Sequence, residues 1–457
     1  ILLSDSESKI ILMSHKQRGA SVTIIGGGFC GLLSAVVCSQ HYAQVTVIER
    51  GSEAQGVPQR HHIHSLQAKG LQILESLLPG ISEDLCATGA VTVRWTEDVQ
   101  IWLSRGYVPQ VDAGVTSIGV SRQHLETCIR ERVHALPNVC FKYRHNVRGL
   151  ICDEESIKGL EVLDREQSRA YCHETSLVLD CSGRQSKTPQ WFADIGYNVP
   201  EDIRIRSFLG YASRWYRIPD GVDLDSLGIA IQPRPHEGFY RGAAVGVAEN
   251  DRVVITLVGV NKDYPPTDEV GFAQFAATLA QPVVHDLIQA LDPISPISGY
   301  RAENRLRPYH KMRDYPDNYL VLGDAFCAFN PIYGQGMMVA AMSAQLLQSY
   351  LDGSMLGKQS AATFQRRLSW IVLMSWLLAT GEDMRYPLVE GKRPNIFDRL
   401  VHRFLDFLFI ASNRDQYVGV TLLQVVQRMK SPLYLANPFL LLRALVAILF
   451  RQPQTRA

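Results

Sequence analysis

The sequence has almost no net charge and no cysteine pattern that would bind a metal. It contains 46 Lys and Arg against 45 Asp and Glu, a net charge of +1, so charge gives no case for nucleic acid or another strongly charged partner. Its nine cysteines include no CxxC pair and no Cys/His spacing typical of zinc. Cys38 and Cys181 lie in apolar runs, which is typical of reduced core residues. We therefore expect a cytoplasmic protein without metal or nucleic acid.

The chain also lacks long apolar segments and targeting signals. The C-terminal run PFLLLRALVAILFR is interrupted by Arg443 and is shorter than the roughly 20 residues that a spanning helix needs. We expect it to pack as a terminal helix, with contact to a membrane surface as the alternative. The start of the chain has no basic region followed by an apolar core and a cleavage site. We expect residues 1–19 to be a leader without a fold.

The order of apolar patterns predicts two interleaved sheets followed by helices. The segments SVTIIG, CGLLSAVVCSQH and VTVIE predict a strand, a helix and a second strand of a parallel sheet with a ligand at its edge. Residues 90–118 and 205–262 contain β-rich runs that predict a second, antiparallel sheet. The predicted parts are the leader (1–19), a discontinuous cofactor domain (20–90, 119–190 and 300–355), a substrate sheet (91–118 and 191–299) and a helical region (356–457).

A glycine-rich turn joins the first predicted strand to the first predicted helix. Gly26, Gly28 and Gly31 have the GxGxxG spacing, in which the glycines permit a tight turn, close approach to a pyrophosphate and close packing of helix on strand. Glu49 ends the second strand, where an acid would bind ribose hydroxyls. The pattern predicts a dinucleotide site but does not separate NAD from FAD, and a turn without a ligand is the structural alternative.

A second unusual stretch, GDAFCAFNPIYGQGM, follows the strand-like run YLVL. Asp324 is its only charge, and Asn330, Pro331 and several glycines precede a long apolar helix. A strand of this kind delivers one carboxylate to a polyol, and the loop then brings backbone amides at a positive helix end against a ligand. An ordinary strand–loop–helix connection is the alternative.

Three separated motifs, GGGFCG with Glu49, LVLDCSGRQSKTP and LVLGDAFCAFNPIYGQGM, resemble those of the FAD-dependent monooxygenase superfamily with the para-hydroxybenzoate hydroxylase fold. Within it the chain resembles bacterial polyether polyene epoxidases most, and squalene epoxidase more distantly. The resemblance implies an α/β fold: a Rossmann-like FAD-binding domain, an inserted, mostly antiparallel β-sheet substrate domain and a C-terminal helical region.

The resemblance also implies roles for individual residues. Asp324 would bond the ribityl chain, while Pro331, Gly334 and Gly336 would lie near the isoalloxazine and no further catalytic residue is expected. Where aromatic hydroxylases carry Asp-Gly, this chain has Ser182-Gly183, so NAD(P)H or a separate flavin reductase is the expected electron source. The full set of expected cofactor-binding residues is Gly26, Gly28, Gly31, Glu49, Arg50, Arg60, Arg122, Asp180, Gly183, Gly323, Asp324, Pro331, Gly334, Gly336 and Met337.

The implied chemistry is insertion of one oxygen atom of dioxygen, through a flavin hydroperoxide, into an electron-rich hydrophobic substrate. Epoxidation of a polyene or terpenoid in natural product biosynthesis is the first expectation, and hydroxylation of a phenolic or polyketide ring is the alternative. A halogenase, a prenyl reductase and a flavin-binding module without activity share the fold. Substrate contacts are predicted for the aromatic residues Phe208, Tyr211, Trp215, Phe239, Trp95 and Trp102, each of which could equally be core.

Overall fold

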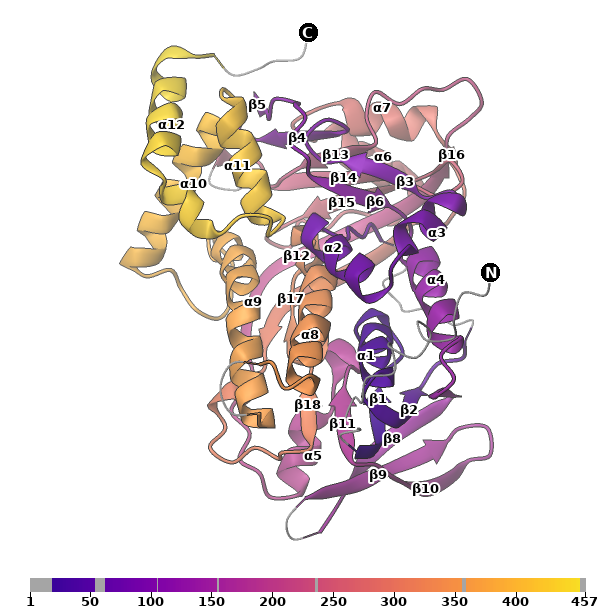
Figure 1. The fold of residues 1–457 in the computed structure, drawn as a ribbon. Coiled ribbons are helices and arrows are strands. Elements are labelled where there is room, and N and C mark those ends of the chain that lie inside the picture. Colours follow the sequence, from indigo (N-terminus) through magenta and orange to yellow (C-terminus); the bar gives the residue numbers. More distant parts are fainter. Residues whose placement is uncertain are drawn as a thin grey trace, which may run out of the picture.

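A five-stranded parallel sheet forms the centre of the first part of the molecule (Figure 1). The computed structural model describes residues 19–53, 62–104, 106–153, 156–234, 237–355 and 359–452. The strand order is β18-β11-β1-β2-β7. These strands are β1 (Gly19–Ile25), β2 (Tyr42–Glu49), β7 (Val139–Tyr143), β11 (Leu177–Asp180) and β18 (Tyr319–Val321).

Helices cover this sheet because each presents an apolar side to it. Helix α1 (Phe29–Ser39) packs against β1, β2 and α8 (Gln335–Leu351), and α8 packs on α9 (Ala361–Asp383). Val22, Leu32 and Leu179 belong to the core that these elements share. The remaining elements around this core are α2 (Ala68–Leu77), α3 (Ile81–Ala87), α4 (Arg122–His134) and α5 (Thr188–Asp194).

A three-stranded antiparallel sheet of order β10-β9-β8 lies at the lower end of the molecule in Figure 1. The sequence analysis did not separate it from the cofactor domain. Its strand β8 contacts β2 of the parallel sheet. The strands are β8 (His145–Cys152), β9 (Ile157–Asp164) and β10 (Arg169–Glu174).

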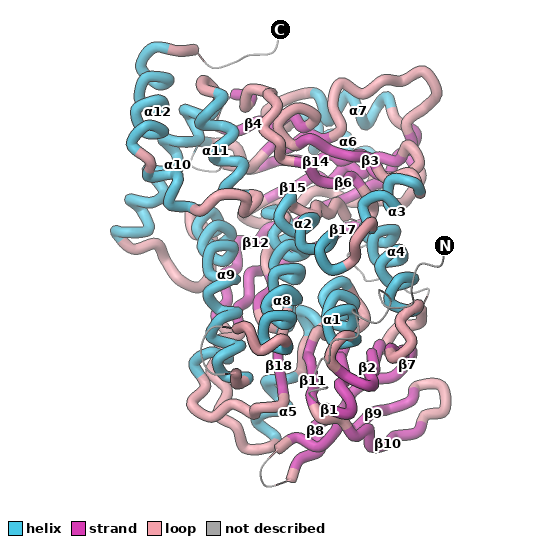
Figure 2. The backbone as a smooth tube through the Cα atoms, viewed as in Figure 1, coloured by secondary structure: helices cyan, strands magenta, loops and turns pink. Residues whose placement is uncertain are grey.

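The second large sheet has nine strands and lies above the parallel sheet (Figures 1 and 2). Its order is β19-β17-β12-β15-β14-β13-β4-β5, with β16 also paired to β12, and only the β13–β4 pair is parallel. Residue 300, a predicted domain boundary, falls inside β17. The strands are β4 (Val99–Leu103), β5 (Gly106–Tyr107), β12 (Ile203–Arg217), β13 (Gly228–Ile231), β14 (Arg241–Ala248), β15 (Arg252–Gly259), β16 (Asp292–Pro293), β17 (Ser298–Leu306) and β19 (Cys327–Ala328).

Helices α6 (Glu269–Ala277) and α7 (Val283–Ala290) cover one face of this sheet, where Phe272 and Val284 share a core with strand residues. A two-stranded sheet of β3 (Val91–Arg94) and β6 (Thr116–Gly119) lies close to it. The C-terminal helices α10 (Ile396–Ser412), α11 (Gln416–Val426) and α12 (Pro438–Phe450) have a small core of their own. The predicted fold class is therefore confirmed, including the inserted antiparallel sheet and the C-terminal helices.

Candidate flavin and substrate site

One large cavity extends between the parallel sheet, the nine-stranded sheet and the C-terminal helices. Its volume is about 1130 Å³, which is larger than the roughly 300–1,000 Å³ of ordinary ligand pockets. It begins at the glycine-rich turn after β1, continues past the loop before α8 and reaches the inner face of β14 and the helices α9 to α11. The cavity therefore has room for a nucleotide cofactor and a second molecule.

The glycine-rich turn has the close contacts that its sequence predicts. Gly26 has φ +99°, and a Cβ there would lie 2.7 Å from the Cys181 carbonyl oxygen. A Cβ at Gly31 would overlap the carbonyl oxygen of Gly26, so Gly31 lies behind the cavity wall and lets α1 approach β1. Gly28 lines the cavity and is the N-cap of α1. The start of α1 therefore presents its positive end to the cavity without an intervening side chain.

Charged side chains surround this turn. Glu49 lines the cavity, and its carboxylate accepts hydrogen bonds from the backbone nitrogens of Gly27 and Gly51, both at 2.8 Å. Arg50 and Arg122 also line the cavity, and the Nε of Arg122 donates to Glu126 at 2.8 Å. Arg60 lies outside the residues that the structure describes.

Arg130, which the sequence analysis did not select, lines the cavity beside the same turn. It lies two helical turns after Arg122 on α4, and its Nη2 reaches the carbonyl oxygen of Gly27 at 3.5 Å. Its Nε is buried without a hydrogen-bond partner. A buried guanidinium nitrogen needs an acceptor, and a cofactor phosphate is an acceptor of matching geometry. A periodic pairing with Arg122 on one helix face was the available sequence signal.

The loop before α8 supplies the second part of the cofactor site. Asp324, Pro331, Gly334, Gly336 and Met337 all line the cavity. Gly334 has φ +64°, which turns the chain into α8, and a Cβ at Gly336 would lie 3.8 Å from the Asp324 carboxylate. Side-chain-free backbone at this helix start fits a flat ring system with a carboxylate nearby. Gly323 lies behind the loop, where a Cβ would meet the Cys30 sulfur at 2.9 Å.

Asp383, at the end of α9, holds this loop from behind and was not predicted. Its Oδ2 accepts from Ser207 (2.9 Å), Asn304 (2.7 Å) and Asn330 (3.4 Å), and its Oδ1 accepts from the Tyr333 hydroxyl (2.7 Å). Burial raises the pKa of Asp383 to about 6, although several of these hydrogen bonds oppose the shift. One buried carboxylate therefore ties residues 330–336, which we call the flavin loop, to β12, β17 and α9.

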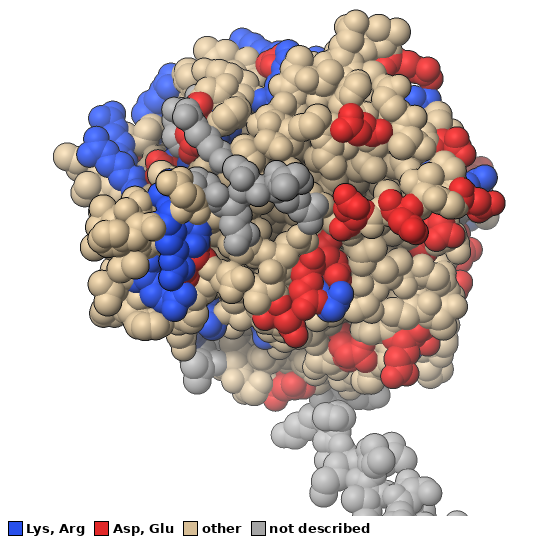
Figure 3. All heavy atoms as spheres, turned by 90° about the horizontal axis from the view of Figure 1, so that it is seen from above, with Lys and Arg blue, Asp and Glu red and all other residues tan. Residues whose placement is uncertain are grey.

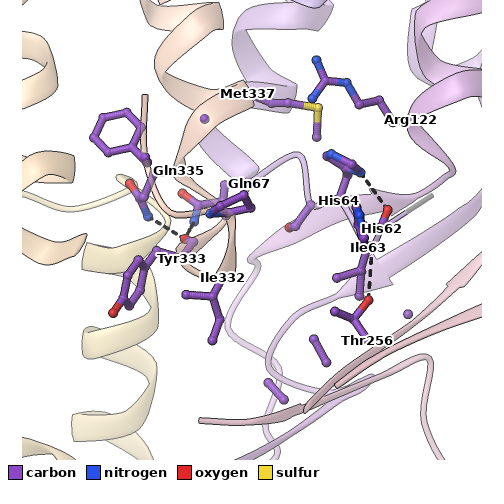
Figure 4. Close-up of a pocket in the computed structure, with 18 of the residues that line it drawn as sticks. His62, Ile63, His64, Gln67, Arg122, Thr256, Ile332, Tyr333, Gln335 and Met337 are labelled. Atoms are coloured by element: carbon purple, nitrogen blue, oxygen red, sulfur yellow. Dashed lines mark hydrogen bonds between the residues drawn. The ribbon is translucent and has the colours of Figure 1, made fainter. Parts of the chain in front are cut away.

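Tyr211 and Gln67 hold the same loop from two other sides. The Tyr211 hydroxyl donates to the Asn330 side chain and accepts from the Ile332 backbone nitrogen. The Gln67 side chain donates to the Tyr333 carbonyl oxygen at 3.3 Å, as Figure 4 shows. Because neighbouring elements fix the loop on three sides, its backbone is preorganised before any ligand binds.

His64 lines the cavity near Arg122 and Met337 (Figure 4). Burial, followed by the nearby Arg122 charge, lowers the pKa of His64 to about 3. Its Nδ1 lies 2.8 Å from the His62 carbonyl oxygen, so Nδ1 carries the proton and the ring is neutral at pH 7. Within the described ranges, no three His, Cys, Asp or Glu side chains are grouped to hold a metal.

Tyr211, Trp215 and Trp95 are the predicted substrate aromatics that line the cavity. Tyr211 and Trp215 are separated by four positions on β12, so the pleat directs them to the same face. Small and branched side chains of β14 and β15, such as Ala244 and Val254, complete this wall. The indole nitrogen of Trp95 is buried without a partner, which offers one polar contact to a largely apolar ligand.

Four predicted residues lie elsewhere. Asp180 is fully buried and its carboxylate accepts from Ser182, Ser186 and Thr188, so its assignment as a cofactor ligand is corrected to a structural role. Gly183, close to it, does line the cavity. Trp102 points away from the cavity and packs edge-on against Tyr107. Phe208 lies beside Lys262, and Phe239 pairs through its backbone with Arg234; neither is part of the cavity wall.

A nucleotide-binding sheet combined with a preorganised amide loop at a helix start defines a flavoprotein. The chain belongs to the family described as FAD binding domain, whose model matches residues 19–364. This membership establishes FAD as the cofactor. The buried Nε of Arg130, which lacks a hydrogen-bond partner, and the glycine turns at Gly26 and Gly334 fit this cofactor. A curated relative, Protein Rv3254 of Mycobacterium tuberculosis, is 28% identical over 423 residues, which cover 83% of this chain and 85% of the relative.

Solved structures with a similar fold include several flavin-dependent proteins. A flavoprotein/dehydrogenase from Cytophaga hutchinsonii has a TM-score of 0.68 and 15% identity over 94% of this chain and 99% of its own. The probable FAD-dependent monooxygenase pqsL from Pseudomonas aeruginosa has a TM-score of 0.60 and 17% identity, with 80% and 96% covered. The flavin-dependent brominase Bmp2 has a TM-score of 0.65 and 15% identity, with 92% and 97% covered. At these identities the likeness concerns the fold alone.

Proposed function

We propose that this protein is an FAD-dependent monooxygenase that epoxidises an alkene in a large hydrophobic substrate, such as a polyene or a terpenoid. The observation that carries the proposal is the single cavity that joins the flavin loop to an apolar sheet face. Bound FAD would activate dioxygen, one atom of which is transferred to the substrate. The net reaction consumes the alkene, dioxygen, NAD(P)H and a proton, and gives the epoxide, water and NAD(P)⁺.

The residues of the chain perform binding, orientation and exclusion of water. Glu49 and Arg130 lie where the adenosine and pyrophosphate would bind, and Asp324 lies where the ribityl chain would bind. The loop Asn330–Gly336, which lines the cavity next to its apolar part, would hold the flavin ring. Val254, Ala244 and Trp215 form an apolar wall of the same cavity, which would favour oxygen transfer over loss of the oxidant to water.

Epoxidation fits this wall because an alkene needs no proton removed before it reacts. The phenol of Tyr211 in the wall is already engaged with Asn330 and Ile332. A halogenase is less well supported, since the described residues that line the cavity include no lysine to carry an oxidised halide.

Hydroxylation of a phenolic or polyketide ring is the second candidate, because a chain of hydrogen bonds begins at His62 on the cavity wall. The His62 Nδ1 lies 2.8 Å from the Ser213 hydroxyl, which lies 2.8 Å from that of Thr256. The His62 ring is 5.4 Å from the Tyr300 ring. Such a chain could take up a phenolic proton and make the ring more electron-rich. His62→Phe should then abolish turnover of a phenol and leave epoxidation of an alkene unchanged.

Labelled dioxygen tests the proposal directly. Purified holoenzyme is supplied with candidate polyene, terpenoid and phenolic substrates and with NADH, NADPH or a separate flavin reductase. We expect mass spectrometry to show product containing one labelled oxygen, formed in proportion to the reductant consumed. Hydrogen peroxide as the sole product from every substrate, with every electron donor, would contradict a monooxygenase.

A further inference from the structure

Helices α10 and α12 expose an apolar surface that their own packing does not require. On α12, Leu440, Ala444 and Ala447 face the local core. The opposite stripe, with Leu442, Leu449 and Phe450, is exposed to solvent, and Phe450 keeps 79% of its surface accessible. We call the C-terminal apolar face the set formed by Ile396, Phe397, Leu400, Leu433, Phe439, Leu442, Leu445, Leu449 and Phe450. Soluble monomers rarely leave such a set uncovered.

The cavity reaches this face. Phe397 and Val401 on α10 and Leu377 on α9 are exposed, and all three also line the cavity. Leu405 and Leu422 continue the lining inward toward the sheet. An apolar molecule that enters beside Phe397 would therefore meet apolar side chains along its path to the flavin loop.

Basic side chains stand beside the same face. Lys392, Arg393, Arg399 and Arg403 are exposed at the start of α10, next to Ile396, Phe397 and Leu400. Residues 390–452 carry nine Lys and Arg but four Asp and Glu, a net charge of +5, whereas the whole chain has +1. Figure 3 shows most of the Lys and Arg on its left, the side where the C-terminal helices lie in Figure 1, and most of the Asp and Glu in its centre and on its right. This arrangement complements a surface that is apolar inside and negatively charged outside.

None of the helices within the described ranges is long and apolar enough to cross a membrane. We infer that the C-terminal apolar face docks on a bilayer that contains anionic lipids, and that the substrate passes from the bilayer into the cavity beside Phe397. The helices lie in the interface, with the apolar stripe in the acyl region and the basic residues among the headgroups. This inference rests on the proposed function, because it assigns the source of its apolar substrate.

Flotation with vesicles tests the docking. The full-length holoenzyme is mixed with vesicles of phosphatidylcholine alone or with added phosphatidylglycerol. We expect binding to the anionic vesicles that weakens with salt. The triple variant Leu442→Glu, Leu449→Glu and Phe450→Glu should bind the vesicles at least about tenfold more weakly, because burial of each of these side chains in the bilayer contributes to the binding free energy. Val270→Glu, an exposed apolar position on α6, is the matched control and should bind like the parent.

A second variant keeps the test independent of folding. Arg399→Glu with Arg403→Glu leaves the apolar face intact and should lose the preference for anionic vesicles, while FAD content and circular dichroism stay unchanged. Failure of the parent protein to bind either vesicle overturns the inference. A dimer that the triple Glu variant dissociates, without vesicle binding, overturns it as well and assigns the face to a second copy of the chain.

The outcome is separable from that of the proposed function. Oxygenation is assayed in parallel on a short-chain, water-soluble alkene with labelled dioxygen. If this substrate is oxygenated while vesicles are not bound, the docking inference fails alone. If neither the soluble nor the vesicle-borne alkene is oxygenated, the proposed function fails, whatever the vesicles bind.

Discussion

Replacing Asp383 with asparagine should remove a pH dependence of stability that this carboxyl creates. Burial raises its pKa from the ordinary 3.8 to about 6, so the folded protein binds a proton more tightly than the unfolded chain. Its contribution to stability is complete below pH 4 and is lost as the pH rises through 6. The shift of about 2 units corresponds to about 3 kcal/mol.

The hydrogen bonds explain why asparagine is the right replacement. An amide oxygen can accept from Ser207, Asn304 and Asn330 where Oδ2 now lies, and the amide NH₂ can donate to the Tyr333 hydroxyl. The variant therefore copies the protonated carboxyl without its charge. Asp383→Ala instead leaves four donors without their acceptor, at a cost of about 1–3 kcal/mol for each buried donor, and should weaken FAD binding by loosening the loop.

Urea unfolding between pH 4 and 7.5, followed by tryptophan fluorescence, measures the effect. We expect the free energy of unfolding of Asp383→Asn, relative to the parent, to rise by about 3 kcal/mol from pH 4 to pH 7. Asp220→Asn replaces an exposed aspartate and serves as the control for loss of a charge. Parallel pH curves for Asp383→Asn and the parent would refute the reasoning.

Four further predictions concern binding. Asp324→Ala should lower FAD affinity by tenfold or more, measured by fluorescence titration of the apoprotein; undiminished affinity would remove Asp324 from the site. Arg130→Met should also weaken FAD binding, and more so at low salt, if its Nε meets a phosphate. Gly31→Ala should prevent FAD uptake, because its Cβ overlaps the Gly26 carbonyl oxygen. Gly149→Ala, whose Cβ would come no closer than 3.7 Å to the Glu161 carboxylate, should retain yellow protein. Trp215→Ala should raise the KM for the substrate with FAD content unchanged, and loss of FAD would assign Trp215 a structural role.

The sequence alone predicted the glycine-rich turn and the loop before α8 as parts of a cofactor site, because these signals are local. Gly26, Gly28 and Gly31 lie within one strand–turn–helix, and Asp324 to Gly336 lie within another. In such units the backbone conformation and the helix end follow from neighbouring residues. The fold class followed from the same order of strands and helices.

The tertiary structure decided which distant residues meet. Asp383 reaches Ser207 across 176 positions, and no local pattern links an aspartate at the end of one helix to a loop more than 50 residues earlier. The strand pleat separated Leu103 from Trp102, since alternate residues face opposite sides of a sheet. Phe208 lies in an irregularity of β12, where its φ of +49° interrupts the alternation that directs Tyr211 and Trp215 to the cavity. The apolar stripe of α12 with Leu442 and Leu449 is exposed because the helix packs into the local core through its other side, with Leu440 and Ala444. These contacts and side-chain orientations depend on long-range packing, which involves all elements at once and leaves no local pattern in the sequence.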